Sequence, residues 1–188
     1  MGMYCSLHRA TGAEVERLIA HPDEVQEFLF PDDGTLPPLR EVRPKGVLGF
    51  LLRLLPVTVS EADPDWRPPE NPPAPTKDPD VVLDIEKDWY GLQFLFTGTE
   101  WGGEEPACYM VGGGEPLDDE GFARALRPQQ ARRFVDFLSA LSREDLARRY
   151  DPARGDAPLD DLLASFTHVK DFVGAAASRG DGVIIHIA

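Results

Sequence analysis

The alternation of hydrophobic and polar positions predicts a β-strand at each end of the chain. Within Met3–Arg9, apolar side chains occupy every second position, which is the period of a strand with one buried face. Val183–Ile187 is apolar on both faces over most of its length, so it is expected to lie inside a sheet. If the two terminal strands pair, His8 and His186 come near each other, and the favoured interpretation of both is a hydrogen-bonded structural histidine.

A hydrophobic period of 3.6 residues predicts helices over much of the remaining chain. The predicted helix starts are a capping box at Thr11–Glu14, the prolines Pro22 and Pro128, and a second capping box at Ser142–Asp145. The longest predicted helix runs from Leu159 to about Ser178, because its apolar residues keep to one face for five turns. Gly180 would end it in the left-handed conformation that glycine adopts readily.

Leu83–Gly98, which reads LDIEKDWYGLQFLFTG, joins an acidic start to an aromatic-rich run. Treated as one helix, it would have Asp84 as its N-cap and Gly98 as its C-terminal stop. Its buried face would then comprise Ile85, Trp89, Leu92 and Phe96. The face left open for function would comprise Glu86, Tyr90, Gln93 and Thr97.

Three further segments complete the expected fold. The apolar run Val47–Leu55 predicts a short buried helix, and Ala107–Val111 predicts a short strand. Seven prolines between Asp63 and Asp80 favour a surface loop at about 63–80 over a proline-rich ligand for a partner. We therefore expect a single α+β domain over residues 1–188. Its helices pack on a small, mostly central sheet that includes the N- and C-terminal strands.

Charge narrows the classes of partner. The chain has 33 acidic and 19 basic residues, and its formal net charge is −14. This balance disfavours nucleic acid and anionic membrane surfaces, because both are bound through Lys and Arg. It is compatible with a basic partner protein, since complementary charge speeds encounter. Solubility alone also explains an acidic surface, and this interpretation is favoured over a specific partner.

The cysteines and the apolar stretches indicate the cellular compartment in which the protein is expected. Cys5 and Cys108 are the only cysteines, and neither has the spacing of a metal ligand, so a reducing environment is expected. The N-terminal residues lack the pattern of a signal peptide, and the apolar stretch Gly46–Leu55 is too short to span a bilayer. The sequence thus predicts a soluble cytoplasmic protein with no cofactor and no metal.

Motifs of catalysis are lacking in the sequence. It contains no G-x-S-x-G elbow, and its four histidines have no metal-ligand spacing. Gly112–Pro116 matches neither glycine-rich phosphate motif and is interpreted as a turn. These observations lean against an enzyme without deciding the question.

Several motifs together resemble the YfbM-like family of small bacterial proteins, a domain of unknown function. The motifs occur in the family's order: Met1-Gly2-Met3, the acidic-Trp-Tyr-Gly-Leu run that ends in Thr97-Gly98, Gly113–Leu117, and Gly121–Pro128 before a helix. The resemblance covers nearly the whole chain except the Pro-rich insert, and it implies an α+β domain without a known reaction or cofactor. The family often has a histidine where this chain has Gln93, so no imidazole is expected to act from that helix.

Two functions of different classes follow. The first is a non-enzymatic binding protein for a basic protein partner, of which a toxin-neutralising (immunity-type) protein is one form. The alternative is a small-molecule or enzymatic site between the Trp89 helix and the Gly113–Arg124 segment. The expected lining of that site is Trp89, Tyr90, Gln93 and Arg124, with Arg124 as an anion clamp.

Overall fold

The computed structural model of the protein describes residues 3–31, 39–41, 60–62, 78–152 and 157–188. The chain divides into two compact units, of which the first comprises Met1–Leu29 and Lys77–Ala188, and the second Phe30–Thr76. In the second unit, β2 (Leu39–Glu41) and β3 (Ser60–Ala62) form an antiparallel pair. The helix that the sequence predicts at 47–55 lies outside the described residues. Most of the predicted Pro-rich loop at about 63–80 lies outside them as well. The single-domain organisation with that loop stays a prediction.

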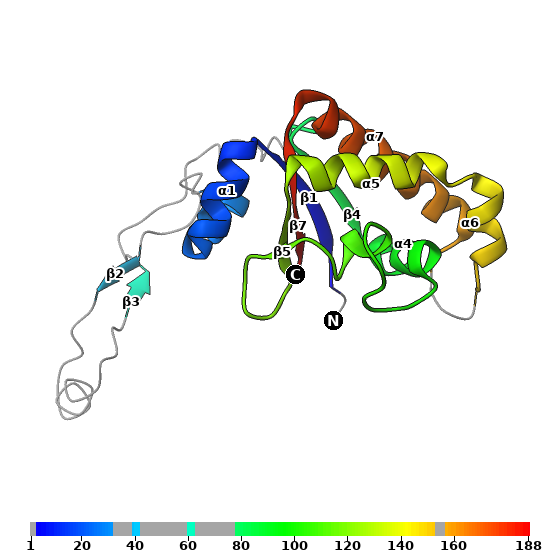
Figure 1. Ribbon diagram of the computed structural model, residues 1–188. Helices are drawn as coiled ribbons and strands as arrows, with labels where there is room; N and C mark the ends of the chain where they lie inside the picture. Colours follow the sequence, from blue (N-terminus) through cyan, green and yellow to red (C-terminus); the bar gives the residue numbers. More distant parts are fainter. Residues whose placement is uncertain (1–2, 32–38, 42–59, 63–77, 153–156) are drawn as a thin grey trace. The chain divides into compact units, whose positions relative to one another are not determined.

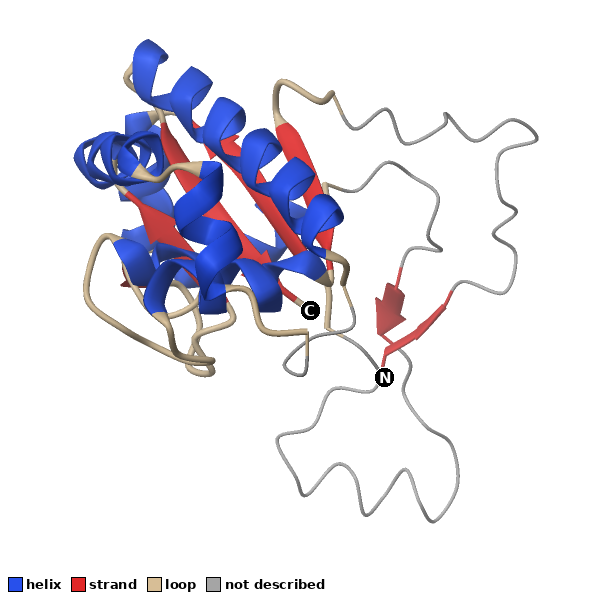
Figure 2. Cartoon of the chain, turned by 90° about the vertical axis from the view of Figure 1, so that its right-hand side faces the viewer, coloured by secondary structure: helices blue, strands red, loops and turns tan. Residues whose placement is uncertain are grey.

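The first unit is built on a five-stranded sheet in which every neighbouring pair is antiparallel (Figure 2). In spatial order its strands are β4 (Val82–Glu86), β1 (Cys5–Ala10), β7 (Gly182–Ile187), β6 (Ala123–Leu126) and β5 (Glu115–Pro116). The two terminal strands thus pair and occupy the interior of the sheet. This confirms the α+β fold class, and the apolar character of β7 on both faces follows from its two neighbours.

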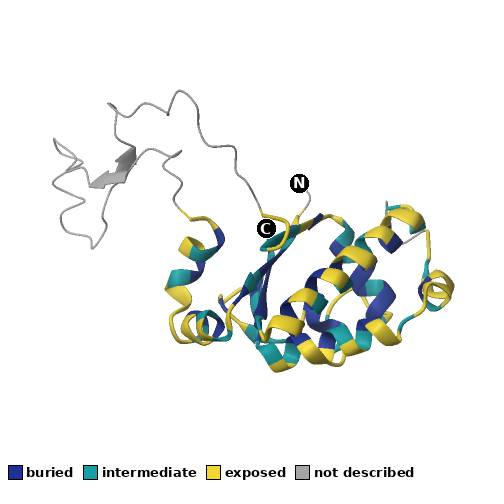
Figure 3. Ribbon diagram, turned by 90° about the horizontal axis from the view of Figure 1, so that it is seen from above, coloured by how far each residue is buried: buried dark blue, intermediate teal, exposed yellow. Residues whose placement is uncertain are grey.

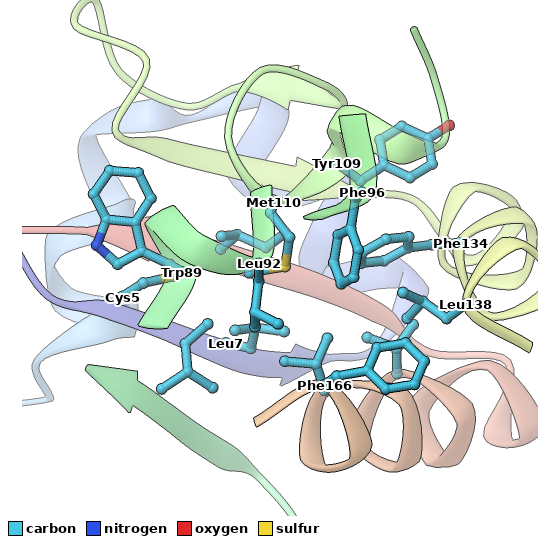
Figure 4. Close-up of a cluster of buried hydrophobic side chains, with 14 of the residues drawn as sticks. Cys5, Leu7, Trp89, Leu92, Phe96, Tyr109, Met110, Phe134, Leu138 and Phe166 are labelled. Carbon is cyan, nitrogen blue, oxygen red and sulfur yellow. The ribbon is translucent and has the colours of Figure 1, made fainter. Parts of the chain in front are cut away.

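Four helices cover one face of the sheet and enclose the larger core (Figure 1). They are α4 (Asp88–Thr97), α5 (Pro128–Ala140), α6 (Arg143–Arg149) and α7 (Leu159–Arg179). Figure 3 shows that buried residues line the inward side of these helices, while exposed residues line the outward side. The aromatic centre of the core is Phe134, which lies close to Phe96 and Tyr109 (Figure 4).

Two shorter helices pack on the opposite face of the sheet. α1 (Gly12–Ala20) is followed by a 3₁₀ turn, η1 (Pro22–Glu24), and then by α2 (Val25–Leu29). Their apolar side chains form a second core with the small strand residues Ala10, Ala123 and Ala125. The sheet therefore has helices on both faces, and each face has its own hydrophobic cluster.

The helix ends agree with the signals in the sequence. Thr11 and Ser142 each cap a helix in a reciprocal capping box, as predicted for Thr11–Glu14 and Ser142–Asp145. Gly98 and Gly180 end α4 and α7 in the left-handed conformation, with φ of 74° and 76°. A β-carbon at those φ values is strained, which is why glycine stops a helix well.

The capping box of α1 predicts a pH dependence of stability. Two hydrogen bonds from Thr11 lower the pKa of Glu14 below its ordinary value of 4.5. Their stabilisation is therefore complete above about pH 4.5 and is lost as the pH falls through the lower pKa of the folded state. Because Glu14 is partly exposed to solvent, which screens its charge, we expect Glu14→Gln to cost less than about 1 kcal/mol at neutral pH. The difference from wild type should vanish near pH 2, as measured by urea unfolding at each pH.

Two expectations about local structure are wrong. Asp84 does not cap a helix, because Val82–Glu86 is a strand that pairs with β1, and the helix begins only at Asp88. Ala107–Met110 is a 3₁₀ helix, η2, and not a strand. Its backbone groups bond locally: the carbonyl of Cys108 accepts from the N–H groups of Val111, Gly112 and Gly113.

Candidate functional site

Trp89 belongs to the core and not to an open pocket. It lies in the first turn of α4 with 3% of its surface exposed. Its indole N–H donates to the carbonyl of Met3 across 3.1 Å, which ties α4 to the segment just before β1. The ring contacts Tyr90 edge-on, with the two centroids 5.7 Å apart. Figure 4 shows Trp89 beside Cys5 at the edge of the buried cluster.

Gln93 is fully buried, so its predicted place on an outward helix face is wrong. Of the other residues predicted for that face, Glu86 is exposed but lies on β4, and Tyr90 and Thr97 are partly exposed. The amide Nε2 of Gln93 donates to the carbonyl of Gly102 at 2.6 Å and to the Thr97 hydroxyl at 3.3 Å. The loop after α4 therefore folds back over the helix. The Oε1 atom of Gln93 has no hydrogen-bond partner among the described residues, although its side chain is shielded from solvent.

Arg124 holds loops together on β6. Its Nε donates to the carbonyl of Gly113 at 2.7 Å, and its two terminal nitrogens reach the carbonyls of Gly114 and Gly121, both at 3.5 Å. These bonds direct the guanidinium toward backbone oxygens of the glycine-rich turn. The expected role of Arg124 as an anion clamp stays a prediction.

The structure connects Gln93 and Arg124 through glycine backbones. Gln93 bonds to Gly102, and a β-carbon built on Gly112 would lie 3.0 Å from the Cα of Gly102. Arg124 donates to the carbonyl of Gly113, which follows Gly112 in the chain. The two side chains thus support opposite sides of one close contact between glycine loops. Trp89 and Tyr90 contact each other in the first turn of α4.

Trp101 is a surface aromatic that the sequence reasoning missed. It lies in the loop after α4 with 53% of its surface exposed, and its ring centroid is 5.7 Å from that of Trp89 at a tilt of 58°. The acidic residues Glu100 and Glu104 flank it in sequence and are exposed. The signal was the string TGTEWGGEEP, where a large aromatic stands among glycines and acids.

Negative charge is concentrated in the part of the chain that contains Trp101. Residues 78–122 carry twelve acidic residues and one basic residue, Lys87, a net charge of −11. The Lys87 ammonium lies 5.7 Å from the ring centroid of the exposed Tyr4. We call Trp101 with Glu100 and Glu104 the Trp101 surface.

A second polar group lies on the sheet face where α1 and α2 pack. The strand register places Asp84, Ser6 and His186 side by side across β4, β1 and β7. His8 follows two residues after Ser6 on the same face, so the pairing of the terminal strands brings both histidines to one face. Burial lowers the pKa of His186, and the nearby Asp118 carboxylate opposes this effect.

Among the described residues, the side chains do not favour metal binding or thiol chemistry. No three side chains among His, Cys, Asp and Glu are grouped there as a metal site would require. Cys5 and Cys108 are buried free thiols, and burial raises the pKa of both. A raised pKa keeps a thiol protonated, and the thiolate is the reactive form.

Comparisons with known proteins identify the fold and not a reaction. The family described as "Domain of unknown function (DUF1877)" matches residues 1–186. A crystal structure of YfbM from Escherichia coli, a protein of unknown function, is similar at 14% sequence identity and a TM-score of 0.61. The match covers 98% of this chain and 99% of that one. No curated protein matches. No helix in the described part of the chain is long and apolar enough to cross a membrane.

Proposed function

The chain belongs to the DUF1877 family, whose role is unknown, and from its own surface we propose that it binds a basic protein partner. The observation that carries the proposal is the exposed Trp101, which is held against the buried Trp89 and flanked by acids. The binding is non-enzymatic, and neutralisation of a basic toxin is one form it could take. The two free cysteines support a reducing, cytoplasmic setting for this role.

Trp101 has the properties of a binding anchor. Tryptophan is enriched among the residues that contribute most to protein interfaces, because it buries a large area with few rotatable bonds. The contact with Trp89 restricts the indole of Trp101 before any partner arrives, which reduces the entropy lost on binding. An exposed aromatic of this size in a structured loop is thus suited to docking.

The acidic residues around Trp101 favour a positively charged partner. Arg and Lys side chains are attracted both by carboxylates and by the face of an indole ring. Glu100 and Glu104 supply the carboxylates within three residues of the ring. The net charge of −11 on residues 78–122 would also attract a basic protein and repel an acidic one.

The proposal is tested by pull-down with the tagged full chain at low and high salt. We expect wild-type protein to retain a basic protein at low salt and to lose it above about 0.5 M salt, where surface charges are screened. Trp101→Ala should lower recovery at least tenfold, because loss of an interface anchor costs about 2 kcal/mol or more. Quantitative mass spectrometry of the eluates measures both effects.

Trp101→Phe is the matched variant, since it keeps an aromatic face in the same loop. Recovery of the partner with Trp101→Phe should stay close to wild type. Equal recovery by wild type and Trp101→Ala would place the contact elsewhere on the protein. If no basic protein is retained by any variant at low salt, the proposed function is wrong.

A small-molecule site between α4 and the Gly113–Arg124 segment is the second candidate. The observation that favours it is the buried Oε1 of Gln93, which lacks a donor among the described residues. A buried acceptor of this kind is normally satisfied, by protein, water or ligand. A bound metabolite would raise the apparent stability of wild type in a thermal-shift screen and leave that of Gln93→Leu unchanged.

A further inference from the structure

Ser6 and His8 form a hydrogen-bonded pair on β1. The Ser6 hydroxyl lies 3.0 Å from Nε2 of His8, a distance at which the ring nitrogen can accept the hydroxyl proton. Both side chains project from the same face of the strand, because they are two residues apart. Ser6 is partly exposed, whereas 8% of His8 is exposed and its ring lies 6.3 Å from the ring of Phe28.

The backbone beside this pair departs from regular strand geometry. The register between β1 and β4 shifts between Cys5 and Ser6. Opposite Cys5 stands Glu86, whose φ of 47° is in the left-handed region that non-glycine residues rarely adopt. Irregularities of this kind re-aim neighbouring side chains and are over-represented beside functional sites. Here the register shift changes the pairing of β1 with β4 immediately before Ser6.

Two further polar residues flank Ser6 across the sheet. His186 on β7 is directly opposite Ser6, and in such pairs the β-carbons are about 4.5–5.5 Å apart. Asp84 is opposite Ser6 on the other neighbour, β4, and is therefore diagonal to His8. An imidazole N–H from His186 can reach an oxygen that develops on a group bound to Ser6.

From this arrangement we propose that Ser6 is a nucleophile, activated by His8, that accepts an acyl group from an ester. The Ser6 oxygen bonds to the ester carbonyl carbon while His8 Nε2 takes the hydroxyl proton. The C–O bond to the alcohol then breaks, and the alcohol leaves with the proton that His8 returns. Water, deprotonated by His8, then attacks the carbonyl carbon of acyl-Ser6. The bond between that carbon and the Ser6 oxygen breaks, the acid leaves, and His8 returns the proton to the Ser6 oxygen. His186 donates a hydrogen bond to the carbonyl oxygen in both steps. This site is separate from the Trp101 surface.

A fluorophosphonate probe tests the nucleophile on the full chain. Attack by Ser6 forms an O–P bond, breaks the P–F bond, and passes the proton to His8. We expect one adduct by intact mass, located at Ser6 by peptide mapping. Ser6→Ala should give no adduct, and His8→Asn should lower the labelling rate at least about 100-fold, the usual contribution of a general base.

Ser178→Ala is the control variant, because the Ser178 hydroxyl on α7 also makes a hydrogen bond, but to the carbonyl of Ala175 and not to a histidine. It should label as wild type does. Circular dichroism confirms that each variant is folded, and the mapped site in wild type needs no variant at all. Absence of an adduct on wild-type Ser6, a mapped adduct at another residue, or equal labelling of wild type and His8→Asn would each overturn the proposal.

Discussion

Phe134→Ala is expected to lower the free energy of unfolding by about 3–5 kcal/mol, the cost of removing a fully buried aromatic ring. Phe134 has no exposed surface and lies on α5 at the centre of the larger core. Its ring meets those of Phe96 and Tyr109 edge-on, with centroids 6.3 and 5.6 Å away, and stacks on Phe137 at 6.5 Å. Truncation therefore removes both the buried area and three aromatic contacts.

Urea unfolding followed by circular dichroism measures this loss. The midpoint should fall while the m-value stays the same, since the surface exposed on unfolding changes little. Ser139→Ala is the matched control on the same helix, because Ser139 is exposed, and its effect should be within about 0.5 kcal/mol. A loss below about 1 kcal/mol for Phe134→Ala would show that this part of the core is not packed as described.

The helices and the terminal strands could be predicted from the sequence because local rules govern them. The stripe of α7, the two capping boxes, and the glycines that end α4 and α7 each depend on residues within a few positions of one another. The burial of β7 on both faces is also indicated by its sequence, which is apolar except at His186. For these elements, the local sequence pattern was enough to predict the secondary structure.

The start of α4 could not be predicted because tertiary pairing overrides a helical pattern. In Val82–Glu86, the spacing from Ile85 to Trp89 suits a helix, yet the segment pairs with β1 as an edge strand. Glu86 then turns the chain with a positive φ, a conformation that non-glycine residues rarely adopt and that the sequence therefore does not predict. The same limit applies to η2, where hydrogen bonds to the Cys108 carbonyl replace strand pairing.

The candidate sites depended on contacts that sequence spacing does not show. Gln93 was expected to face outward, but the loop that carries Gly102 folds over it and buries it. Trp101 is held by a ring contact with Trp89 that the spacing of the two residues in the sequence does not predict. For Ser6 and His186, the register of β1 against β7 places them opposite each other, and register is set by the whole sheet.

Reversing the charge of Glu100 and Glu104 together should weaken binding of the basic partner by at least about 100-fold. Close charge pairs at interfaces couple by about 1.5–7 kcal/mol, and each 1.4 kcal/mol is tenfold in affinity. Glu100→Lys with Glu104→Lys replaces two attractions beside Trp101 by two repulsions. The salt dependence of the affinity should also become shallower, because fewer favourable charge contacts remain to be screened.

A specific surface must be distinguished from the effect of net charge alone. Asp136→Lys with Asp171→Lys is the matched double variant, since it makes the same change in net charge at exposed positions on α5 and α7. If the acidic character of the protein only steers encounter, the two double variants should behave alike. If the Trp101 surface is the docking site, they should differ.

The most direct test is the dissociation constant of the recovered partner for wild type and both double variants, measured by calorimetry at two salt concentrations. We predict a loss of at least about 100-fold for Glu100→Lys with Glu104→Lys, and a loss below about fivefold for Asp136→Lys with Asp171→Lys. Equal losses in the two double variants, or no loss in either, would contradict the assignment of the Trp101 surface as the binding site.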